Sequence, residues 1–483
     1  MIVRTKYGKL RGVEENGMIA FKGIPFAKAP IGNLRFKPPV PVEPWEGIFD
    51  AAKFGNRSLQ VVEEESKDEF CFSEDCLNLN IWTPAIDNNR RPVIFFIHGG
   101  GHISGGNSDK FLDGPHLIQG REAVMVAANY RLGALGYLYL AELLGEEYKD
   151  SGNCGLLDQI LALNWIKENI AAFGGDPDNV ILMGQSAGGK SVANLMVTPA
   201  AKGLYHRAII QSGSVQCIRD AHTATMITKL VLDKLGIADT PEKILTKSGE
   251  EIIAAQKEAY EVYDAVHLFG PVLDGRTIKE KPEQYIKSGK VGDIPVMIGY
   301  NKEELFYSDP DYNPTDHESI ATFKKCYGKN WGIVYKKYLE YKKEYSSAIA
   351  FDMTQTLCVY GNATIFLTRL LAEAGHKVWS YRWDYGGPIG RAQHSSEMPY
   401  LFGYIEEINN EFDSIDDDLS KMINETWMSF ICKGNPENKY IPEWLPCTAG
   451  KIGYRMHLDG GFHLEQIDLH SYYQELPMQV IKL

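Results

Sequence analysis

The sequence predicts an α/β fold in which a mostly parallel central sheet has helices on both faces and helical cap insertions. Short, continuous apolar runs are typical of strands that are buried on both faces of a sheet. They occur at residues 93–97, 123–128, 180–183, 208–210, 295–299 and 378–383. Apolar residues at helical spacing between these runs supply the covering layers. Together the two patterns predict a sheet enclosed by helices.

The helical pattern is clearest in residues 156–170. Apolar residues recur there at helical spacing, at Leu156, Ile160, Leu163, Ile166 and Ile170. We expect this helix to pack on the sheet as core, with no cofactor role. Residues 219–269 and 307–374 are predicted to be mixed helical insertions that form a cap. No linker, repeat or low-complexity tract divides the 483 residues, so residues 1–483 are predicted to form one domain.

Residues 184–191, with the sequence Gly-Gln-Ser-Ala-Gly-Gly-Lys-Ser, fit two motifs that predict different chemistry. As G-x-S-x-G, the segment is a nucleophile elbow, in which a sharp strand-to-helix turn presents the hydroxyl of Ser186. As G-x-x-x-x-G-K-S, it is a phosphate-binding loop, with Lys190 on the phosphates and Ser191 on magnesium. Both motifs need a strand before the turn and a helix after it, so the local context leaves both open.

The segment that follows the run at 93–97 favours a hydrolase. It begins at His98 and has the HGGG form of an oxyanion loop, whose bare backbone N–H groups approach a substrate carbonyl closely. Gly100 and Gly101, with the N–H group of Ala187, would hold the developing negative charge. A phosphate-binding protein should also have a strand that ends in a magnesium-holding Asp. The nearest candidate, Asp274, begins an ordinary turn, which disfavours that alternative.

Several segments together resemble the carboxylesterase type B family, which also contains the cholinesterases. The family's serine signature is similar to residues 173–177 and 180–188, and its upstream signature to residues 74–80. Further similar segments lie at residues 129–133, 155–159, 211–213 and 434–436. The resemblance extends over nearly the whole chain. It implies an α/β-hydrolase fold and an enzyme that cleaves carboxylic esters.

The resemblance also implies a Ser–Glu–His catalytic triad. The family's acid falls at Glu304, directly after Glu303, and an exchange of roles between these two residues stays open. The family's histidine falls at His394. His394 would take the proton of the Ser186 hydroxyl, and Glu304 would hold the imidazole in the required tautomer. An acyl-enzyme then forms, and a water activated by the same histidine releases the acid.

Four further residues are expected behind the triad or in the pocket, namely Gln185, His102, Ser212 and Glu397. Glu397 is expected to steady the site. His102 follows the oxyanion glycines and either lines the pocket or is a structural or solvent-facing histidine. Gln185 stands where the family usually has Glu, which removes a negative charge from the pocket.

One absence narrows the expected substrate. Choline-cleaving relatives stack a tryptophan on quaternary ammonium, and the corresponding segment between Ser58 and Cys76 has no Trp. Acetylcholine is therefore an improbable substrate, and small to medium uncharged esters are predicted. The same segment also bears on disulfide formation. The family's secreted members pair the cysteine at the place of Cys76 with one at the place of Ser58. The resemblance thus implies a reduced Cys76 thiol in a reducing compartment, with a Cys71–Cys76 pair as the less favoured alternative.

The composition fits an ordinary soluble enzyme, with 44% hydrophobic and 23% charged residues and a formal net charge of -13. We see no cluster of Lys and Arg that could bind phosphates, which argues against nucleic-acid binding. No apolar stretch is long enough to span a bilayer, and the first residues lack a signal pattern. We therefore expect a cytoplasmic enzyme with a small-molecule ester as its partner, no nucleic-acid or membrane partner, and no cofactor or metal.

Three functions of different classes follow from these observations. An ester hydrolase is favoured. A nucleotide-dependent enzyme that uses the phosphate-binding motif and a catalytically inactive binding protein on the same fold are the alternatives. Non-enzymatic relatives usually lose the serine, and Ser186 is present, which disfavours the last alternative. The natural ester and the oligomeric state do not follow from the sequence.

Overall fold

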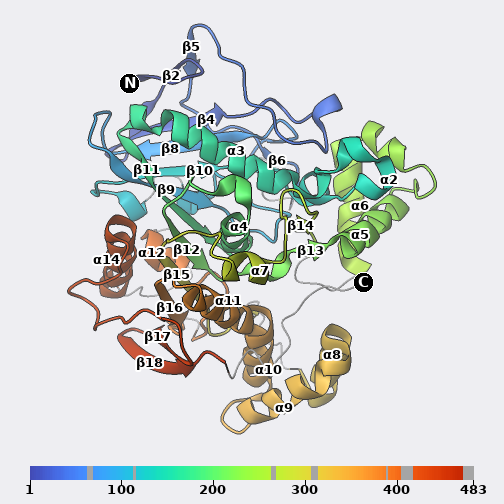
Figure 1. Ribbon diagram of the computed structural model, residues 1–483, viewed down its shortest axis with the longest axis vertical. Helices are drawn as coiled ribbons and strands as arrows, with labels where there is room; N and C mark the ends of the chain where they lie inside the picture. Colours follow the sequence, from blue (N-terminus) through green and yellow to red (C-terminus); the bar gives the residue numbers. More distant parts are fainter. Residues whose placement is uncertain are drawn as a thin grey trace. The chain divides into compact units, whose positions relative to one another are not determined.

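Each apolar run predicted to be a strand overlaps a β-strand of the structure. The structure is a computed structural model that describes residues 1–62, 69–112, 116–262, 268–305, 314–387, 390–403 and 417–470. Its described residues form two compact units. The first comprises Met1–Arg207 and Cys217–Tyr285, and the second comprises Ala208–Gln216 and Ile286–Val480. The chain passes from the first unit to the second within helix α7 (Pro282–Lys287) (Figure 1).

The first unit is organised around the strand order β11-β9-β10-β8-β4-β3. The strands are β3 (Val13–Glu15), β4 (Met18–Pro25), β8 (Asn78–Thr83), β9 (Arg91–Ile97), β10 (Val124–Ala128) and β11 (Gly175–Gln185). Strand β9 pairs in parallel with both β10 and β11, whereas β8, β4 and β3 add antiparallel pairs. All five residues of β10 are buried, as the continuous apolar run predicts. Strand β11 begins earlier than predicted, because its register against β9 shifts between Gly175 and Val180.

Short antiparallel and parallel strands complete the first unit. They are β1 (Ile2–Arg4), β2 (Lys9–Arg11), β5 (Ile48–Asp50), β6 (Arg57–Ser58), β7 (Phe72–Ser73), β13 (Arg219–Asp220) and β14 (Val272–Leu273). Its helices are α1 (Gly133–Tyr137), α2 (Ala141–Leu144), α3 (Cys154–Asn169), α4 (Ala187–Met196), α5 (Ala221–Lys234) and α6 (Gly249–Val262). The five apolar residues predicted for the helix at 156–170 are all buried, and α3 packs on β11.

The insertion predicted at residues 219–269 contains α5 and α6. These helices share a buried apolar cluster with α1, to which Leu135, Ile227, Val231 and Ile252 contribute. Helix α5 begins at a regular cap, because the side chain of Asp220 accepts a hydrogen bond from the backbone N–H of Thr223 at 2.8 Å.

The second unit has the strand order β18-β17-β16-β15-β12. The strands are β12 (Arg207–Gln211), whose first residue lies in the first unit, β15 (Val296–Asn301), β16 (Val378–Trp383), β17 (Ile452–Leu458) and β18 (Phe462–Asp468). Strands β12, β15, β16 and β17 pair in parallel, and β18 closes the edge as an antiparallel hairpin partner of β17. The hairpin was not predicted, because its strands alternate apolar with charged residues and carry buried Arg455 and His457.

Helices flank the strands of the second unit. They are α8 (Asp316–Tyr327), α9 (Trp331–Tyr341), α10 (Ser347–Thr356), α11 (Asn362–Glu373), α12 (Met398–Phe402) and α14 (Asp417–Lys433), with a π-helix at Leu357–Gly361 between α10 and α11. The insertion predicted at residues 307–374 thus contains α8 to α11. Helix α8 starts at a capping box, in which Thr315 and Glu318 bond each other's backbone N–H groups.

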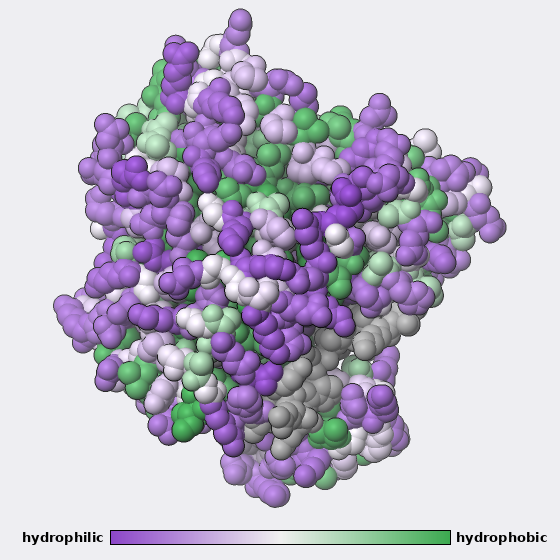
Figure 2. All heavy atoms as spheres, in the orientation of Figure 1, coloured by the Kyte–Doolittle hydropathy of each residue, from purple (hydrophilic) through white to green (hydrophobic). Residues whose placement is uncertain are grey.

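The face shown in Figure 2 is largely hydrophilic, and its hydrophobic residues occur in small, scattered groups. None of the helices that the structure describes combines the length and the apolar character that crossing a membrane requires. All eight cysteines are free thiols. Cys76 is buried, and burial raises the pKa of its thiol to about 12, whereas Cys71 is exposed.

Candidate active site

Ser186 lies in the first unit, at the single residue between the end of β11 and the start of α4. Its backbone has a φ of 58° and a ψ of -122°, a strained conformation that residues other than glycine rarely adopt. This is the geometry of a nucleophile elbow, in which the sharp turn holds a serine at the end of a parallel strand. The G-x-S-x-G interpretation of the segment therefore agrees with its local structure.

The two glycines that flank Ser186 permit this turn through close backbone contacts. A Cβ atom on Gly184 would lie 2.5 Å from the carbonyl carbon of Gly188. A Cβ atom on Gly188 would lie 1.9 Å from the carbonyl oxygen of Ile97, at the end of β9. Both distances are far below van der Waals contact, so the motif needs glycine at both places.

The predicted oxyanion loop lies against the elbow. A Cβ atom built on Gly99 would be 3.0 Å from the carbonyl oxygen of Gln185 and 3.3 Å from Cβ of Ser186. Gly100 and Gly101 have positive φ values of 95° and 63°. Within the described part of the chain, the N–H groups of Gly100, Gly101 and Ala187 donate no hydrogen bond. The first unit therefore presents three backbone donors around the serine turn, as an oxyanion hole requires.

Glu304 and His394 lie in the second unit and are hydrogen-bonded to each other. Glu304 follows the end of β15, and His394 lies in the segment between β16 and α12. The Nδ1 atom of His394 contacts Oε2 of Glu304, and the backbone N–H of Asn301 donates to Oε1 at 2.7 Å. Glu304 is fully buried, whereas the His394 side chain is 21% exposed. A buried carboxylate thus holds one ring nitrogen of a partly accessible imidazole.

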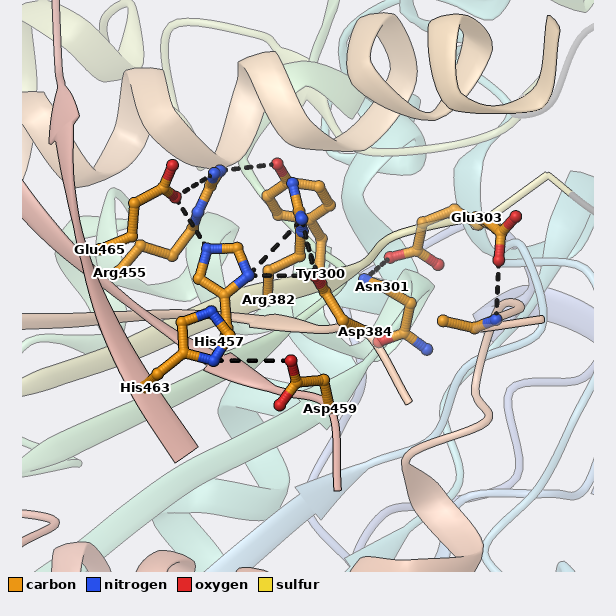
Figure 3. A network of polar contacts seen from close by, with 12 residues as sticks. Tyr300, Asn301, Glu303, Arg382, Asp384, Arg455, His457, Asp459, His463 and Glu465 are labelled. Carbon is orange, nitrogen blue, oxygen red and sulfur yellow. Dashed lines mark hydrogen bonds and ion pairs between the residues drawn. The ribbon is translucent and has the colours of Figure 1, made fainter. Parts of the chain in front are cut away.

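The contacts of Glu304 and of its neighbour Glu303 differ. Glu303 accepts a hydrogen bond from the backbone N–H of Ala392 at 3.0 Å (Figure 3). Glu303 also forms an ion pair with Arg391 at 2.6 Å. Arg391 also pairs with Asp352 at 2.7 Å. Glu303 therefore joins two segments of the second unit, and Glu304 is the residue that contacts His394.

Glu397 supports the pair indirectly. Its Oε2 accepts a hydrogen bond from Nδ2 of Asn301 at 2.7 Å, and its Oε1 accepts one from Nε2 of Gln211 at 3.1 Å. The same amide of Asn301 donates to the carbonyl oxygen of Gln393, next to His394, at 2.7 Å. Burial and then the nearby charge of Glu304 raise the pKa of Glu397 to about 7. Glu397 thus orients the amide that links the Glu304 turn to the His394 segment.

This raised pKa predicts a pH dependence of stability. The folded state binds the Glu397 proton more readily than the unfolded chain, so the Glu397 contribution to stability falls as pH rises from about 4.5 to about 7. We expect Glu397→Gln to remove part of the fall in the free energy of unfolding, on the order of 2 kcal/mol between pH 5 and 7. Thermal or urea unfolding at both pH values measures it. Burial also raises the pKa of Asp352 to about 7. Asp352 therefore still makes the variant less stable as pH rises. An unchanged slope would contradict the prediction.

The other predicted pocket residues differ in their surroundings. His102 is fully buried, its Nε2 lies 3.2 Å from the hydroxyl of Ser191, and its ring meets Tyr137 edge-on at 5.2 Å. The solvent-facing alternative is therefore wrong, and burial lowers the pKa of His102 to about 3. Gln185 is buried beside Gly99 in the first unit. Ser212 is buried in the second unit, and its hydroxyl has no hydrogen-bond partner among the described residues.

The phosphate-binding alternative does not fit the local structure. Lys190 lies inside α4 and is fully buried, and Ser191 accepts a hydrogen bond from Nε2 of Gln159 at 3.1 Å. Asp274 caps its own turn, because its Oδ1 accepts from three backbone N–H groups, those of Arg276, Thr277 and Ile278. Among the described residues, no group of three or more His, Cys, Asp or Glu side chains could hold a metal ion.

A polar network braces the strands that carry the acid (Figure 3). His457 lies between two carboxylates, with Nδ1 at 3.0 Å from Asp384 and Nε2 at 2.7 Å from Glu465. Burial opposes its charge, but the hydrogen bonds to Asp384 and Glu465 raise the pKa of His457. Glu465 also binds Arg455, which donates to the hydroxyl of Tyr300 on β15 at 3.0 Å. The network ties β17 and β18 to the strand that leads to Glu304.

Sequence reasoning assigned no role to Asn301 or Tyr360. Asn301 stands at the end of β15, where a polar residue after an apolar run is a usable signal. The ring of Tyr360 lies 5.3 Å from that of His394, from within the π-helix at Leu357–Gly361. A π-helical turn adds one residue to the helical period, so no spacing rule would have placed Tyr360 there.

The predicted site residues thus fall into two groups. The first unit holds Ser186, Ala187, Gly100, Gly101, Gln185 and His102, and the second holds Glu304, His394, Ser212 and Glu397. Within the first unit the oxyanion loop adjoins the serine turn. Within the second unit the acid, the histidine and Glu397 share one hydrogen-bond network.

Comparisons with known proteins agree with this chemistry. Residues 1–466 match the carboxylesterase family. The chain is 36% identical to para-nitrobenzyl esterase of Bacillus subtilis, with 91% of each chain covered. It is 32% identical to phenmedipham hydrolase of Pseudarthrobacter oxydans, with 92% of each chain covered. The crystal structure of a carboxylesterase from Geobacillus stearothermophilus is similar with a TM-score of 0.86, at 34% identity and 98% coverage of both chains.

Proposed function

The chain belongs to the carboxylesterase family of α/β-hydrolases and is a carboxylesterase, and we propose that it cleaves small to medium uncharged esters through an acyl-enzyme on Ser186. The observation that carries this proposal is the contact between His394 Nδ1 and the buried carboxylate of Glu304. A carboxylate at Nδ1 selects the tautomer in which the other ring nitrogen, Nε2, acts as the base.

The first half of the proposed reaction acylates the enzyme. His394 Nε2 takes the proton of the Ser186 hydroxyl as Oγ attacks the carbonyl carbon of the ester. The oxyanion receives hydrogen bonds from the N–H groups of Gly100, Gly101 and Ala187. When the intermediate collapses, the carbon–oxygen bond to the alcohol breaks and the imidazolium returns its proton to the departing oxygen. The alcohol leaves, and the acyl group stays on Ser186.

The second half repeats these roles with water. His394 takes a proton from the water molecule that attacks the acyl carbon, and the same three N–H groups hold the second oxyanion. Collapse breaks the bond to Ser186 Oγ, which regains its proton from the imidazolium. The carboxylic acid leaves. Glu304 keeps its negative charge throughout and stabilises the imidazolium that forms in each half.

The preference for uncharged esters rests on the residue next to the nucleophile. Gln185 is a buried, neutral amide, so it offers a cationic substrate no charge partner. The Bacillus relative is named for a para-nitrobenzyl ester, which is uncharged, and this agrees with the proposal. As part of the proposal we place the enzyme in the cytoplasm. Ser58 stands where secreted relatives have the cysteine that pairs with Cys76, which suits a reducing compartment.

Trapping the acyl-enzyme tests the proposal. The purified protein is mixed with p-nitrophenyl butyrate or p-nitrophenyl acetate and quenched in acid within the first turnovers. We expect a burst of nitrophenol close to one equivalent of enzyme and a butyryl or acetyl mass on the peptide that contains Ser186. Hydrolysis with no burst and no adduct on that peptide would contradict the covalent route. A panel of esters with longer acyl chains or with cationic alcohols then measures the substrate preference.

Gly100→Ala is expected to lower kcat by about 10² to 10³, the usual effect of losing one oxyanion donor. A Cβ atom there would lie 2.1 Å from the carbonyl oxygen of Ser104, and the φ of 95° is strained for alanine, so the loop must move. The measurement is kcat for p-nitrophenyl butyrate with thermal unfolding in parallel. Gly275→Ala, at a φ of 72° with open space around it, is the control for backbone strain alone. Similar kcat losses in both variants would contradict a role for the loop.

A further inference from the structure

Helices α8 and α9 form a hairpin that packs against α10 through one face only. Four side chains of the hairpin are buried in an apolar cluster with Phe351 of α10, namely Phe323, Tyr327, Val334 and Tyr338. The rings of Phe323 and Phe351 stack at 5.3 Å. The opposite face of α9 is exposed, which leaves an amphipathic hairpin with one side to solvent (Figure 1).

This hairpin has a charge opposite to that of the protein. Residues 316–343 contain seven lysines, two glutamates, one aspartate and no arginine, whereas the whole chain has a formal net charge of -13. Ion pairs link Lys337 and Lys342 to acidic side chains of the hairpin. Lys337 pairs with Glu340 at 2.9 Å, and Lys342 pairs with Asp316 at 2.6 Å.

The other five lysines are exposed. They are Lys324, Lys325, Lys329, Lys336 and Lys343. Lys336 lies on α9, and Lys343 lies two residues beyond the end of that helix. Lys337 and Lys342 thus point toward acidic partners in the hairpin. Their chain neighbours, Lys336 and Lys343, are exposed. The result is a cationic surface on an otherwise acidic protein.

Apolar side chains lie among these lysines. Ile333 is 47% exposed and Leu339 is 42% exposed, both on the solvent side of α9. Trp331, Tyr335 and Tyr341 are half-buried and pack against the buried cluster, and the ammonium of Lys324 lies 4.8 Å from the centre of the Trp331 ring. Exposed aliphatic side chains beside lysines on one helix face are the composition of a helix that lies in a membrane interface.

We propose that this lysine face, defined as Lys324, Lys329, Lys336 and Lys343 with Ile333 and Leu339, docks the enzyme on an anionic lipid surface. The ammonium groups approach the lipid phosphates and carboxylates, and Ile333 and Leu339 enter the boundary between headgroups and acyl chains. A nucleic acid fits the face less well, because it has no arginine to contact phosphates or bases bidentately and the exposed aliphatics would stay in water. This proposal differs from the sequence-based expectation of no membrane partner. That expectation rested on the lack of a spanning segment, which does not bear on surface docking.

Vesicle co-sedimentation of the full-length protein tests the proposal. The probes are phosphatidylcholine vesicles with and without phosphatidylserine, at low and at high salt. We expect binding only to the vesicles with phosphatidylserine, and at least about tenfold weaker partitioning of Lys336→Glu/Lys343→Glu, because each lysine contributes about 1 kcal/mol near such a surface. Ile333→Ser/Leu339→Ser should weaken binding at both salt concentrations. Thermal unfolding and p-nitrophenyl butyrate hydrolysis in solution should be unchanged in both variants.

The matched control is Lys229→Glu/Lys257→Glu. It changes the net charge equally, at exposed lysines on the paired helices α5 and α6 of the first unit. The proposal is overturned if wild type does not bind the anionic vesicles or if the control variant loses as much binding as the lysine-face variant. It is also overturned if wild type binds only single-stranded or duplex oligonucleotides and the lysine-face variant loses that binding. None of these outcomes depends on ester hydrolysis, so the test stands apart from the proposed function.

Discussion

Ser186→Ala is expected to lower kcat for p-nitrophenyl butyrate by about 10⁶, the scale seen when the nucleophile of a serine hydrolase is removed. Alanine has no oxygen to attack the ester, so no acyl-enzyme forms and only the slow reaction of bound ester with water is left. The elbow should persist, because its shape depends on the close backbone contacts at Gly184 and Gly188. The measurement is kcat and KM by stopped assay at high enzyme concentration, with thermal unfolding to confirm the fold.

Ser191→Ala is the matched control from the same segment. Ser191 is buried in α4 and accepts a hydrogen bond from Gln159. Its loss leaves a buried amide unsatisfied, so we expect about 1 to 3 kcal/mol less stability and nearly unchanged kcat. The phosphate-binding motif would instead make Ser191 essential and Ser186 dispensable. Esterase activity that survives Ser186→Ala but disappears in Ser191→Ala would reject the elbow as the catalytic element.

Glu304→Gln is expected to lower kcat by about 10⁴ with little change in stability. The amide can still accept the hydrogen bond from the Asn301 N–H, but its NH₂ group facing Nδ1 of His394 favours the wrong tautomer of the ring. The imidazolium formed during attack also loses its carboxylate partner. The substitution changes which ring nitrogen carries the proton. We therefore expect the pH dependence of kcat to change as well as the magnitude of kcat.

Glu303→Gln separates the two adjacent acids. Glu303 pairs with Arg391 and not with His394, so its loss leaves a largely buried guanidinium with fewer partners. We expect a stability loss on the order of 3 kcal/mol and a much smaller change of kcat than in Glu304→Gln. The opposite pattern, with the larger kcat effect in Glu303→Gln, would exchange the roles of the two residues.

Local sequence patterns predicted the strands that are buried on both faces and the helix α3. Such elements depend on neighbouring residues alone, since every side chain in β10 must be apolar whatever it meets. The same patterns missed β17 and β18, where charged residues are buried. His457 and Arg455 are stable there because Glu465 on the partner strand binds both of them. From the sequence alone, a charged residue in a strand is expected at the surface. Its partner on another strand is known only from the pairing of the strands.

The lysine face was missed for a related reason. The lysines of α8 and α9 come in pairs separated by aromatic residues, a pattern with no obvious cluster. Folding divides the pairs, because Lys337 and Lys342 find acidic partners within the hairpin while Lys336 and Lys343 point outward. The charge of a surface depends on which lysines form ion pairs. The sequence does not show those ion pairs, because they form only in the folded protein.

The order of residues predicted the nucleophile and the oxyanion loop through short motifs whose chemistry is local, and the resemblance to a family predicted the histidine and the class of reaction. The folded chain was needed to show that Glu304, and not Glu303, contacts His394, to bury His102 and to place Tyr360 and Asn301. Two adjacent glutamates have the same chemistry in the sequence. They differ only through the atoms that reach them from distant segments, and those distances exist only once the backbone has folded.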